Sequence, residues 1–255
     1  MNIHSTAIIE NGAQIAEGVT IGALAFIGGN VTIGSGTVIQ HHASIGGHTV
    51  LGENNVVFPY ACLGGQTQDL KYIGDLTGLE IGHHNIFREY VTIHSGTKEG
   101  SVTRIGHHNA FLAYSHVAHD CTLGNHIIMS SLAALAGYVR IGDYANIAWN
   151  SGVHQFCLIG DYAMLAGCSK AVMDILPFML AEGQPAKTRY FNKINLQRHQ
   201  FSQTDIDHVK NIHRILFHSK CNHSEALGQL KRYRQISNVY ETVICAIESS
   251  QRGFC

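Results

Sequence analysis

Residues 19–34 read Val19-Thr20-Ile21-Gly22-Ala23-Leu24-Ala25-Phe26-Ile27-Gly28-Gly29-Asn30-Val31-Thr32-Ile33-Gly34, and they contain the repeat from which most of the chain is built. An aliphatic residue recurs every six positions, and a small or β-branched residue stands two positions before each one. Residues two apart in a strand point to the same face, so both columns must point inward. Glycine follows each aliphatic residue, as we expect where a short strand ends at a corner. This pattern predicts a parallel β-helix.

The repeat extends in both directions from this stretch. The aliphatic column is unbroken from Ile3 to Leu63, returns from Ile81 to Ile93 and runs again from Ile105 to Leu165, which makes 25 six-residue units. Such a repeat resembles that of the hexapeptide acyltransferases, whose coils are triangular prisms of three units each. The resemblance implies a left-handed β-helix, an exception to the usual right-handed crossover. It also implies that residues 18 apart stack at about the 4.8 Å strand spacing, in about eight coils.

Two domains are predicted. Residues 1–186 are expected to form the left-handed β-helix, with external loops near 64–80 and 94–104, where the repeat lapses. Residues 187–255 are expected to form a helical domain after Gly183-Gln184-Pro185. Within it, Ser202 is a plausible N-cap followed by apolar residues on one face, and shorter helices are expected near 224–234 and 237–250. These helices would cap the open end of the prism and contribute to packing between subunits.

Composition and charge exclude several classes of protein. With 255 residues, of which 45% are hydrophobic, the chain can bury a core in one solenoid and a smaller appendage. No apolar run approaches the length of a membrane span and no signal peptide is evident, so we expect a cytoplasmic protein without a transmembrane segment. Residues 1–186 carry 6 basic and 13 acidic side chains, and residues 187–255 carry 11 and 5. The basic tail suits an acidic partner or a phosphate, or it is simply a solvated helical surface; no nucleic-acid partner is expected.

The candidate chemistry lies at His119 and Asp120. By the 18-residue spacing, His119 stacks beneath Gly137 and then Gln155, and Asp120 stacks beneath Tyr138. These positions point outward, so His119 is either a surface histidine or a functional one. A histidine beside a carboxylate, close to the backbone N–H of Gly137, has a base for a nucleophile and a donor for an oxyanion. Glycine leaves room for an incoming carbonyl, and the arrangement therefore predicts acyl transfer.

Five segments resemble the UDP-N-acetylglucosamine 3-O-acyltransferases, the hexapeptide family that begins lipid A synthesis. They follow the family's order and spacing, and the resemblance covers essentially the whole chain. The segments are Gln68-Asp69-Leu70-Lys71-Tyr72, His116-Val117-Ala118-His119-Asp120-Cys121, Leu135-Ala136-Gly137, Val153-His154-Gln155-Phe156-Cys157 and Gly167-Cys168-Ser169.

This resemblance implies transfer of an (R)-3-hydroxyacyl chain from acyl carrier protein to the 3-position of UDP-N-acetylglucosamine. The enzyme would be a homotrimer with sites between neighbouring prisms, and it would need no cofactor and no metal. His119 would be the general base, supported by Asp120, and the Gly137 N–H would hold the oxyanion. Gly167, with Trp149 one coil away, would set the acyl-chain pocket. The implied substrate-binding residues are Asp69, Lys71, His116, Tyr138, His154, Gln155, Arg198 and His199.

Two positions depart from the family and two alternatives stay open. Tyr138 stands where the family commonly has histidine, and a Tyr hydroxyl cannot carry positive charge near neutral pH. His199 replaces a second arginine beside Arg198, which leaves the diphosphate contact in doubt. The alternatives are an acetyl-CoA-dependent sugar acetyltransferase on the same fold and acylation of a 3-amino sugar nucleotide.

Two further classes are disfavoured. A zinc carbonic anhydrase on this fold needs a His-x4-His pair on the β-helix, and residues 1–186 contain no histidines with that spacing. The related N-acyltransferase carries a uridine-binding domain before its repeats, whereas here the repeats begin at Ile3.

Overall fold

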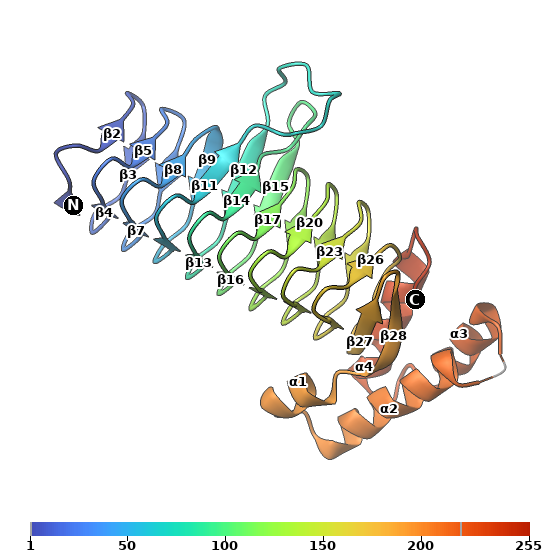
Figure 1. Ribbon diagram of the computed structural model, residues 1–255. Coiled ribbons are helices and arrows are strands. Elements are labelled where there is room, and N and C mark those ends of the chain that lie inside the picture. Colours follow the sequence, from blue (N-terminus) through green and yellow to red (C-terminus); the bar gives the residue numbers. More distant parts are fainter. Residues whose placement is uncertain (1, 220) are drawn as a thin grey trace.

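A computed structural model describes residues 2–219 and 221–255 as a long prism of short parallel strands followed by helices (Figure 1). Three sheets form its sides, and successive strands fall on the three sheets in turn. The first sheet holds, in spatial order, β1 (Asn2–Ile3), β4 (Thr20–Ile21), β7 (Val38–Ile39), β10 (Val56–Val57), β13 (Ile86–Phe87), β16 (Ala110–Phe111), β19 (Ile128–Met129), β22 (Asn146–Ile147), β25 (Met164–Leu165), β27 (Met179–Gly183) and β28 (Ala186–Phe191).

The other two sides have the same construction. The second sheet holds β2 (Ile8–Ile9), β5 (Phe26–Ile27), β8 (Ser44–Ile45), β11 (Cys62–Gly65), β14 (Thr92–His94), β17 (His116–Val117), β20 (Ala134–Leu135), β23 (Gly152–Val153) and β26 (Lys170–Ala171). The third holds β24 (Leu158–Ile159), β21 (Arg140–Ile141), β18 (Thr122–Leu123), β15 (Val102–Ile105), β12 (Gly78–Ile81), β9 (His48–Leu51), β6 (Thr32–Ile33) and β3 (Gln14–Ile15).

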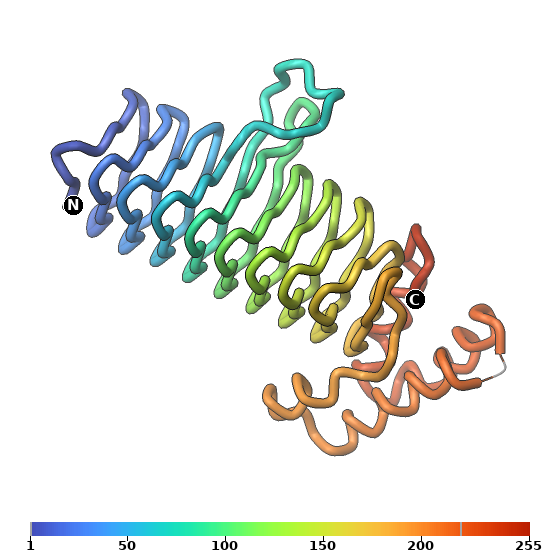
Figure 2. Tube along the Cα trace, in the orientation of Figure 1, coloured from blue at the N-terminus to red at the C-terminus, as the bar shows by residue number. Residues whose placement is uncertain are grey.

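Strand register follows the 18-residue spacing wherever the repeat is unbroken. His116, for example, pairs with Ala134. Around the two lapses the offset grows, because Val56 pairs with Ile86 and Ile86 with Ala110. The extra residues leave the prism as two excursions, 66–77 and 95–101, which stand side by side at one corner (Figure 2).

Both predicted columns form the core. Ile21, Ile27 and Ile33 are at most 1% exposed, and the small residues two positions before them are fully buried. The first coil is less covered, with Ile3 39% exposed, because it has a neighbouring coil on one side only. The predicted fold class, a left-handed parallel β-helix with a C-terminal helical region, is confirmed.

The corners differ from the prediction in how they use glycine. A Cβ on Gly22 would lie 2.6 Å from the backbone nitrogen of His41, so the glycine after the aliphatic residue is needed for space between coils. The left-handed residue comes two positions after this glycine and is often not glycine itself. His84 has φ 59° and Asp120 has φ 60° at this position. Side chains at these corners are therefore displayed outward in regular columns.

The C-terminal part contains a hairpin as well as helices. β27 and β28 pair antiparallel and cover the last edge of the first sheet, an edge that would otherwise present unpaired backbone groups. The chain expected to be helical from residue 187 thus begins with strand, and its helices are α1 (Lys193–Arg198), α2 (Gln203–Phe217), α3 (His223–Lys231) and α4 (Asn238–Ser249). Ser202 caps α2 as predicted, with its hydroxyl accepting the Asp205 N–H at 3.1 Å. The sequence did not predict α1.

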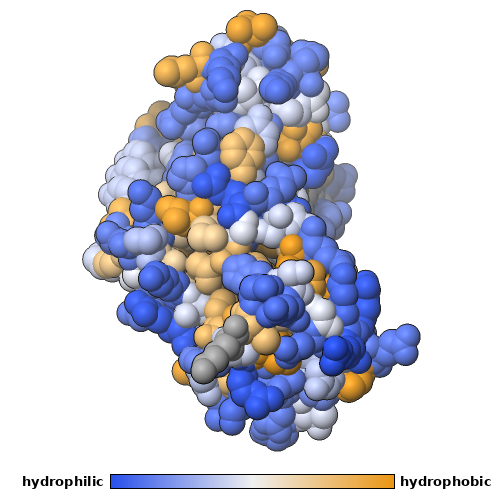
Figure 3. Space-filling model, turned by 90° about the vertical axis from the view of Figure 1, so that its right-hand side faces the viewer, coloured by the Kyte–Doolittle hydropathy of each residue, from blue (hydrophilic) through white to orange (hydrophobic). Residues whose placement is uncertain are grey.

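The helical end presents a mixed surface. Seen from this end, apolar residues gather near the middle of the face and hydrophilic residues surround them (Figure 3). In the ranges 2–219 and 221–255, no helix has both the length and the apolar character needed to cross a membrane.

Candidate active site

His119 and Asp120 occupy the corner between β17 and β18. The His119 Nδ1 lies 2.8 Å from the Asp120 Oδ2, and the two side chains are only 13% and 6% exposed. A carboxylate on Nδ1 fixes that nitrogen as the N–H, which leaves Nε2 with a free lone pair. The predicted pair is thus an oriented imidazole with its basic nitrogen turned away from the carboxylate.

Asp120 is held by the second excursion. Its Oδ1 accepts the Thr97 N–H at 3.3 Å, and its own N–H donates to the Thr103 hydroxyl at 2.8 Å. Burial acts to raise the pKa of Asp120, but hydrogen bonds from His119, Ser101 and Thr97 outweigh it and the net pKa is lowered. Asp120 is therefore an anion at neutral pH, as support of a histidine base requires.

Gly137 lies directly over the His119 ring. A Cβ on Gly137 would sit 2.6 Å from the His119 Nε2, so only glycine leaves this nitrogen in place. The neighbouring coils stay in register, since the Tyr138 N–H donates to the His119 carbonyl at 3.0 Å. Among the described residues no group accepts the Gly137 N–H, which leaves a backbone donor beside the basic nitrogen.

An open groove of about 740 Å³ runs along the second sheet past this point. Its floor is the outward column of β20, β23 and β26, where Ala134 and Gly152 are small and Lys170 stands at the far end. Small residues along a groove leave room for an extended ligand. Of the residues singled out from the sequence, the groove brings together His116, His119, Gly137, His154 and Gln155.

Two other imidazoles lie near His119 and are kept neutral. The His116 Nδ1 is 2.7 Å from the Thr92 hydroxyl, and burial lowers the pKa of His116. His94, which the sequence did not indicate, packs edge-on against His116 at 4.9 Å. Burial lowers the pKa of His94 to about 4. At neutral pH both rings can therefore donate or accept hydrogen bonds without adding positive charge.

Tyr138 completes the surroundings of the base. Its ring meets His119 edge-on at 5.4 Å and stacks on Phe156 at 4.9 Å. Burial, followed by the negative charges of Asp120 and Asp69, raises the pKa of Tyr138. The phenol therefore stays protonated and is a neutral donor beside the histidine.

Eight of the thirteen residues expected in the site do not line this groove of the single chain. Asp120 and Tyr138 are in contact with His119, and Asp69 follows Gln68, which lines the groove. The other five lie farther away. Lys71 is exposed on the first excursion. Arg198, on α1, lines a separate cavity of about 470 Å³, and His199 packs on Tyr144 at 4.5 Å. Trp149 is 54% exposed, and a Cβ on Gly167 would meet only the Trp149 carbonyl, at 3.4 Å.

The corner opposite the groove carries a column of stacked rings from successive coils. His84, His108 and His126 lie parallel at 4.8 and 4.9 Å, and Tyr144 continues the column. Beside it, His83 stacks on His107 at 5.0 Å. The rings fill equivalent turns and face one another, so the column is repeated corner packing.

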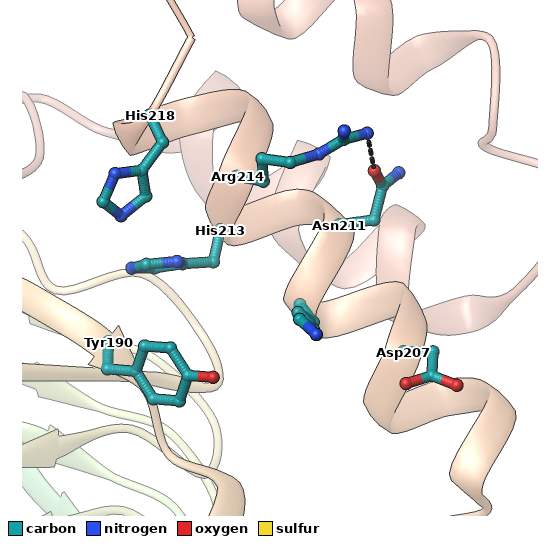
Figure 4. A pocket seen from close by; sticks show the side chains of 7 residues that line it. Tyr190, Asp207, Asn211, His213, Arg214 and His218 are labelled. Atoms are coloured by element: carbon teal, nitrogen blue, oxygen red, sulfur yellow. Dashed lines mark hydrogen bonds between the residues drawn. The ribbon is translucent and has the colours of Figure 1, made fainter.

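A further cavity of about 510 Å³ lies between Tyr190 and α2 (Figure 4). The Arg214 guanidinium donates to the Asn211 amide oxygen at 2.9 Å, and His213 and His218 pack at 4.9 Å. These two histidines have the His-x4-His spacing that residues 1–186 lack. A spacing of five residues is well over one helical turn of 3.6 residues, so it does not place two side chains on the same face of a helix. Figure 4 draws the two rings packed on each other above Tyr190. The cavity contains none of the residues that the sequence put forward, within the part of the chain described.

The chain is similar to known proteins over almost its whole length. Residues 174–255 match the family model described as UDP N-acetylglucosamine O-acyltransferase, domain 2. A Burkholderia lata protein named acyl-[acyl-carrier-protein]–UDP-N-acetylglucosamine O-acyltransferase is 44% identical over 98% of both chains. The solved UDP-N-acetylglucosamine acyltransferase of Francisella novicida is 35% identical with a TM-score of 0.97, covering 99% of this chain and 93% of that one. The Campylobacter jejuni enzyme is 37% identical with a TM-score of 0.94, covering 99% and 98%.

Proposed function

The chain belongs to the acyl-[acyl-carrier-protein]–UDP-N-acetylglucosamine O-acyltransferase family of enzymes, and from that premise we propose its reaction. It transfers an (R)-3-hydroxyacyl chain from acyl carrier protein to the 3-hydroxyl of UDP-N-acetylglucosamine, the first step of lipid A synthesis. The observation that carries the proposal is the His119–Asp120 pair facing the free N–H of Gly137.

The His119 Nε2 removes the proton from the sugar 3-hydroxyl as its oxygen attacks the thioester carbonyl. Asp120 stabilises the imidazolium that forms, because its carboxylate is already bonded to Nδ1. The Gly137 N–H holds the oxyanion of the tetrahedral intermediate. When the intermediate collapses, a C–O bond has replaced the C–S bond and the carrier thiolate takes the proton back from His119.

Substrate binding is assigned by position along the groove. His116, His154 and Gln155 line it and would position sugar and acyl chain. Tyr138 would supply a neutral donor in place of the family's usual histidine, which fits its raised pKa. Asp69, whose negative charge contributes to the raised pKa of Tyr138, and the exposed Lys71 would contact the nucleotide sugar or the donor.

A homotrimer would complete the site. Arg198 and His199 lie on and just after α1, away from the groove of their own chain. In a trimer with sites between neighbouring prisms, α1 of one subunit would bring these residues to the diphosphate bound by the next. Both proposed substrates, a nucleotide sugar and a carrier-bound acyl chain, are products of cytoplasmic metabolism, so we place the reaction in the cytoplasm.

The acyl chain is assigned to the groove end near Gly167. A methyl there would meet only the Trp149 carbonyl, so the position itself is open, and the half-exposed Trp149 lies one coil away. If the indole limits length, Trp149→Gly shifts preference toward longer donors, with each buried methylene contributing about 0.8 kcal/mol. An unchanged length profile across graded acyl-carrier-protein thioesters would remove Trp149 from the pocket.

The deciding experiment compares donors and acceptors on the purified chain. We expect turnover with (R)-3-hydroxyacyl-acyl-carrier-protein and UDP-N-acetylglucosamine, and much slower turnover with the matching CoA thioesters. Preference for acetyl-CoA would favour a sugar acetyltransferase instead. Preference for a 3-amino sugar nucleotide would keep the mechanism and change the acceptor atom.

A further inference from the structure

Two buried threonine hydroxyls join the two excursions of the prism. The Oγ1 atoms of Thr67 and Thr97 lie 2.8 Å apart, and the residues are 6% and 3% exposed. A hydroxyl removed from water is costly to leave without a partner, so each side chain depends on the other. This pair fixes the position of one excursion relative to the other.

Thr97 reaches the catalytic pair through its backbone. Its N–H donates to the Asp120 Oδ1 at 3.3 Å and to the Ser101 hydroxyl at 2.8 Å. Asp120 in turn holds the His119 Nδ1 through its other oxygen. A rotation of the Thr97 backbone would therefore withdraw a hydrogen bond from the carboxylate that orients the base.

Thr67, at the start of the first excursion, holds the segment that contains Asp69. Its hydroxyl oxygen accepts the Asp69 N–H at 3.1 Å, and the Asp69 carboxylate accepts the Lys71 N–H at 2.9 Å. Gln68, between Thr67 and Asp69, lines the groove beside His119, so this segment of the excursion borders the site. Thr67 thus orders the segment assigned above to the nucleotide sugar.

The excursions are also joined by backbone hydrogen bonds, from the Ser95 N–H to the Gly65 carbonyl at 2.9 Å and from the Gly100 N–H to the Leu76 carbonyl at 2.8 Å. Their side-chain contacts near the tips are exposed. The Leu76 N–H donates to Glu99 at 2.8 Å and the Glu99 N–H to Asp75 at 3.2 Å, both near the tips. Solvent can replace such bonds at little cost. The contact at the base of the excursions, between Thr67 and Thr97, is shielded from that exchange.

We propose that Thr67 and Thr97 are positioning residues that couple the Asp69 segment to the His119–Asp120 pair. The hydroxyl contact holds the Thr97 N–H on Asp120 while it holds Asp69 at the mouth of the site. Ligand contact with the first excursion and alignment of the base are therefore linked through this buried side-chain contact. This inference rests on the proposed function, since it concerns how that site is kept in order.

The test uses the full-length enzyme and isosteric substitutions. Thr97→Val keeps the volume and removes the hydroxyl, and we expect kcat to fall about 10- to 100-fold because small displacements of a base are costly. KM should change by less than about threefold, since the groove itself is intact. Thr97→Ser restores the hydroxyl and should restore most of the rate. Thr67→Val removes the contact from the other side, and it should also raise KM for the nucleotide sugar.

Thr37→Val is the matched control. Thr37 is fully buried, its hydroxyl donates to the Gly52 carbonyl at 3.0 Å, and it accepts the Asn55 N–H at 3.2 Å, far from the groove. This variant should lower Tm as the loss of any buried hydroxyl does, and leave kcat and KM at their wild-type values. It separates general destabilisation from an effect on the base.

A double-mutant cycle with Asp120→Asn gives the decisive reading. If Thr97 acts through Asp120, Thr97→Val should cost less than about twofold in the Asp120→Asn background. The same fold loss in both backgrounds, or a wild-type kcat in folded Thr97→Val, would overturn the proposal. Failure of the proposed function would be seen earlier and separately, as absence of acyl transfer by the wild-type chain.

Discussion

The prism carries two groups of histidines whose environments differ sharply. The corner histidines His83, His84, His107, His108 and His126 stack in parallel on one another, one coil apart. The histidines around the base, His94, His116 and His119, meet at steep angles or face other groups. His116 and His119 each have a polar partner, the Thr92 hydroxyl and the Asp120 carboxylate. The same repeat thus displays one residue type in two ways.

The difference lies in what occupies the neighbouring turns. At the corner, the His83 Nδ1 accepts the Glu53 N–H and the His107 Nδ1 accepts the His83 N–H, both at 2.9 Å. One coil later, the Asn125 side-chain oxygen accepts the His107 N–H at 2.8 Å. Those imidazoles act as structural acceptors. At the groove, a carboxylate binds Nδ1 of His119 and a glycine leaves Nε2 open. The carboxylate partner and the neighbouring glycine leave His119 able to act as a base, whereas the stacked corner imidazoles stabilise the turns.

The largest expected effect contrasts one histidine from each group. Removal of a general base lowers kcat by about 10²–10⁴-fold, so His119→Ala should lose activity while Tm barely changes. His107→Ala should do the reverse, keeping kcat and losing about 0.5–1.5 kcal/mol of stability with the lost acceptor. Steady-state kinetics and thermal melts on both variants decide the matter. Normal turnover in folded His119→Ala would end its role as the base.

The next expected effect removes the space over the base. In Gly137→Ala the new methyl would lie 2.6 Å from the His119 Nε2, so the ring must move and kcat should fall about 100-fold. Gly46→Ala is the matched control, because a methyl there meets no atom within 4 Å among the described residues. Equal activity of the two variants would show that the open neighbour of His119 does not matter.

The sequence predicted those residues whose position the repeat controls. His119 and Gly137 are separated by one coil, so their contact follows from counting, and His108 stacks on His126 at the same 18-residue offset. Thr97 and Ser101 lie in an excursion whose path is not set by the strand register. Their hydrogen bonds to Asp120 therefore could not be predicted by counting residues.

Other misses have related causes. His94 ends a strand beside an excursion, so its contact with His116 depends on where the chain re-enters the prism. β28 forms because it covers a sheet edge, which is a tertiary reason with little local signal. The placement of Arg198 and His199 toward a groove stays a prediction, because it depends on the proposed association of subunits and the spacing within one chain does not give it.

A smaller effect is expected at Tyr138, the neutral aromatic neighbour of the base. Tyr138→Phe keeps the edge-on contact with His119 at 5.4 Å and removes the hydroxyl beside Asp120. A single neutral hydrogen bond is worth about 0.5–1.5 kcal/mol, so kcat/KM should fall about 2- to 12-fold. Tyr138→His tests whether the family's usual residue serves equally well here. A loss of 100-fold or more in Tyr138→Phe would mean that the phenol takes part in proton transfer.

The smallest expected effect concerns acid sensitivity of the corner. Burial, followed by the charges of His83, His108 and His84, lowers the pKa of His107 below its usual value. The unfolded chain therefore takes up this proton at a higher pH than the folded chain does. The contribution to stability is complete above about pH 6.5, the ordinary pKa of histidine, and is lost as pH falls from there through the folded pKa. Protonation of Nδ1 would also remove the acceptor of the His83 N–H.

His107→Asn should reduce this loss, because an amide oxygen accepts the same N–H, as Asn125 does one coil later, and does not titrate. The measurement is the fall in Tm between pH 7.5 and pH 5.5, which we expect to shrink by about 1–2 °C in this variant. His48→Asn, at an exposed histidine outside the stack, is the control and should leave the fall unchanged. Equal falls in wild type and His107→Asn would show that His107 makes no separate contribution to the loss of stability in acid.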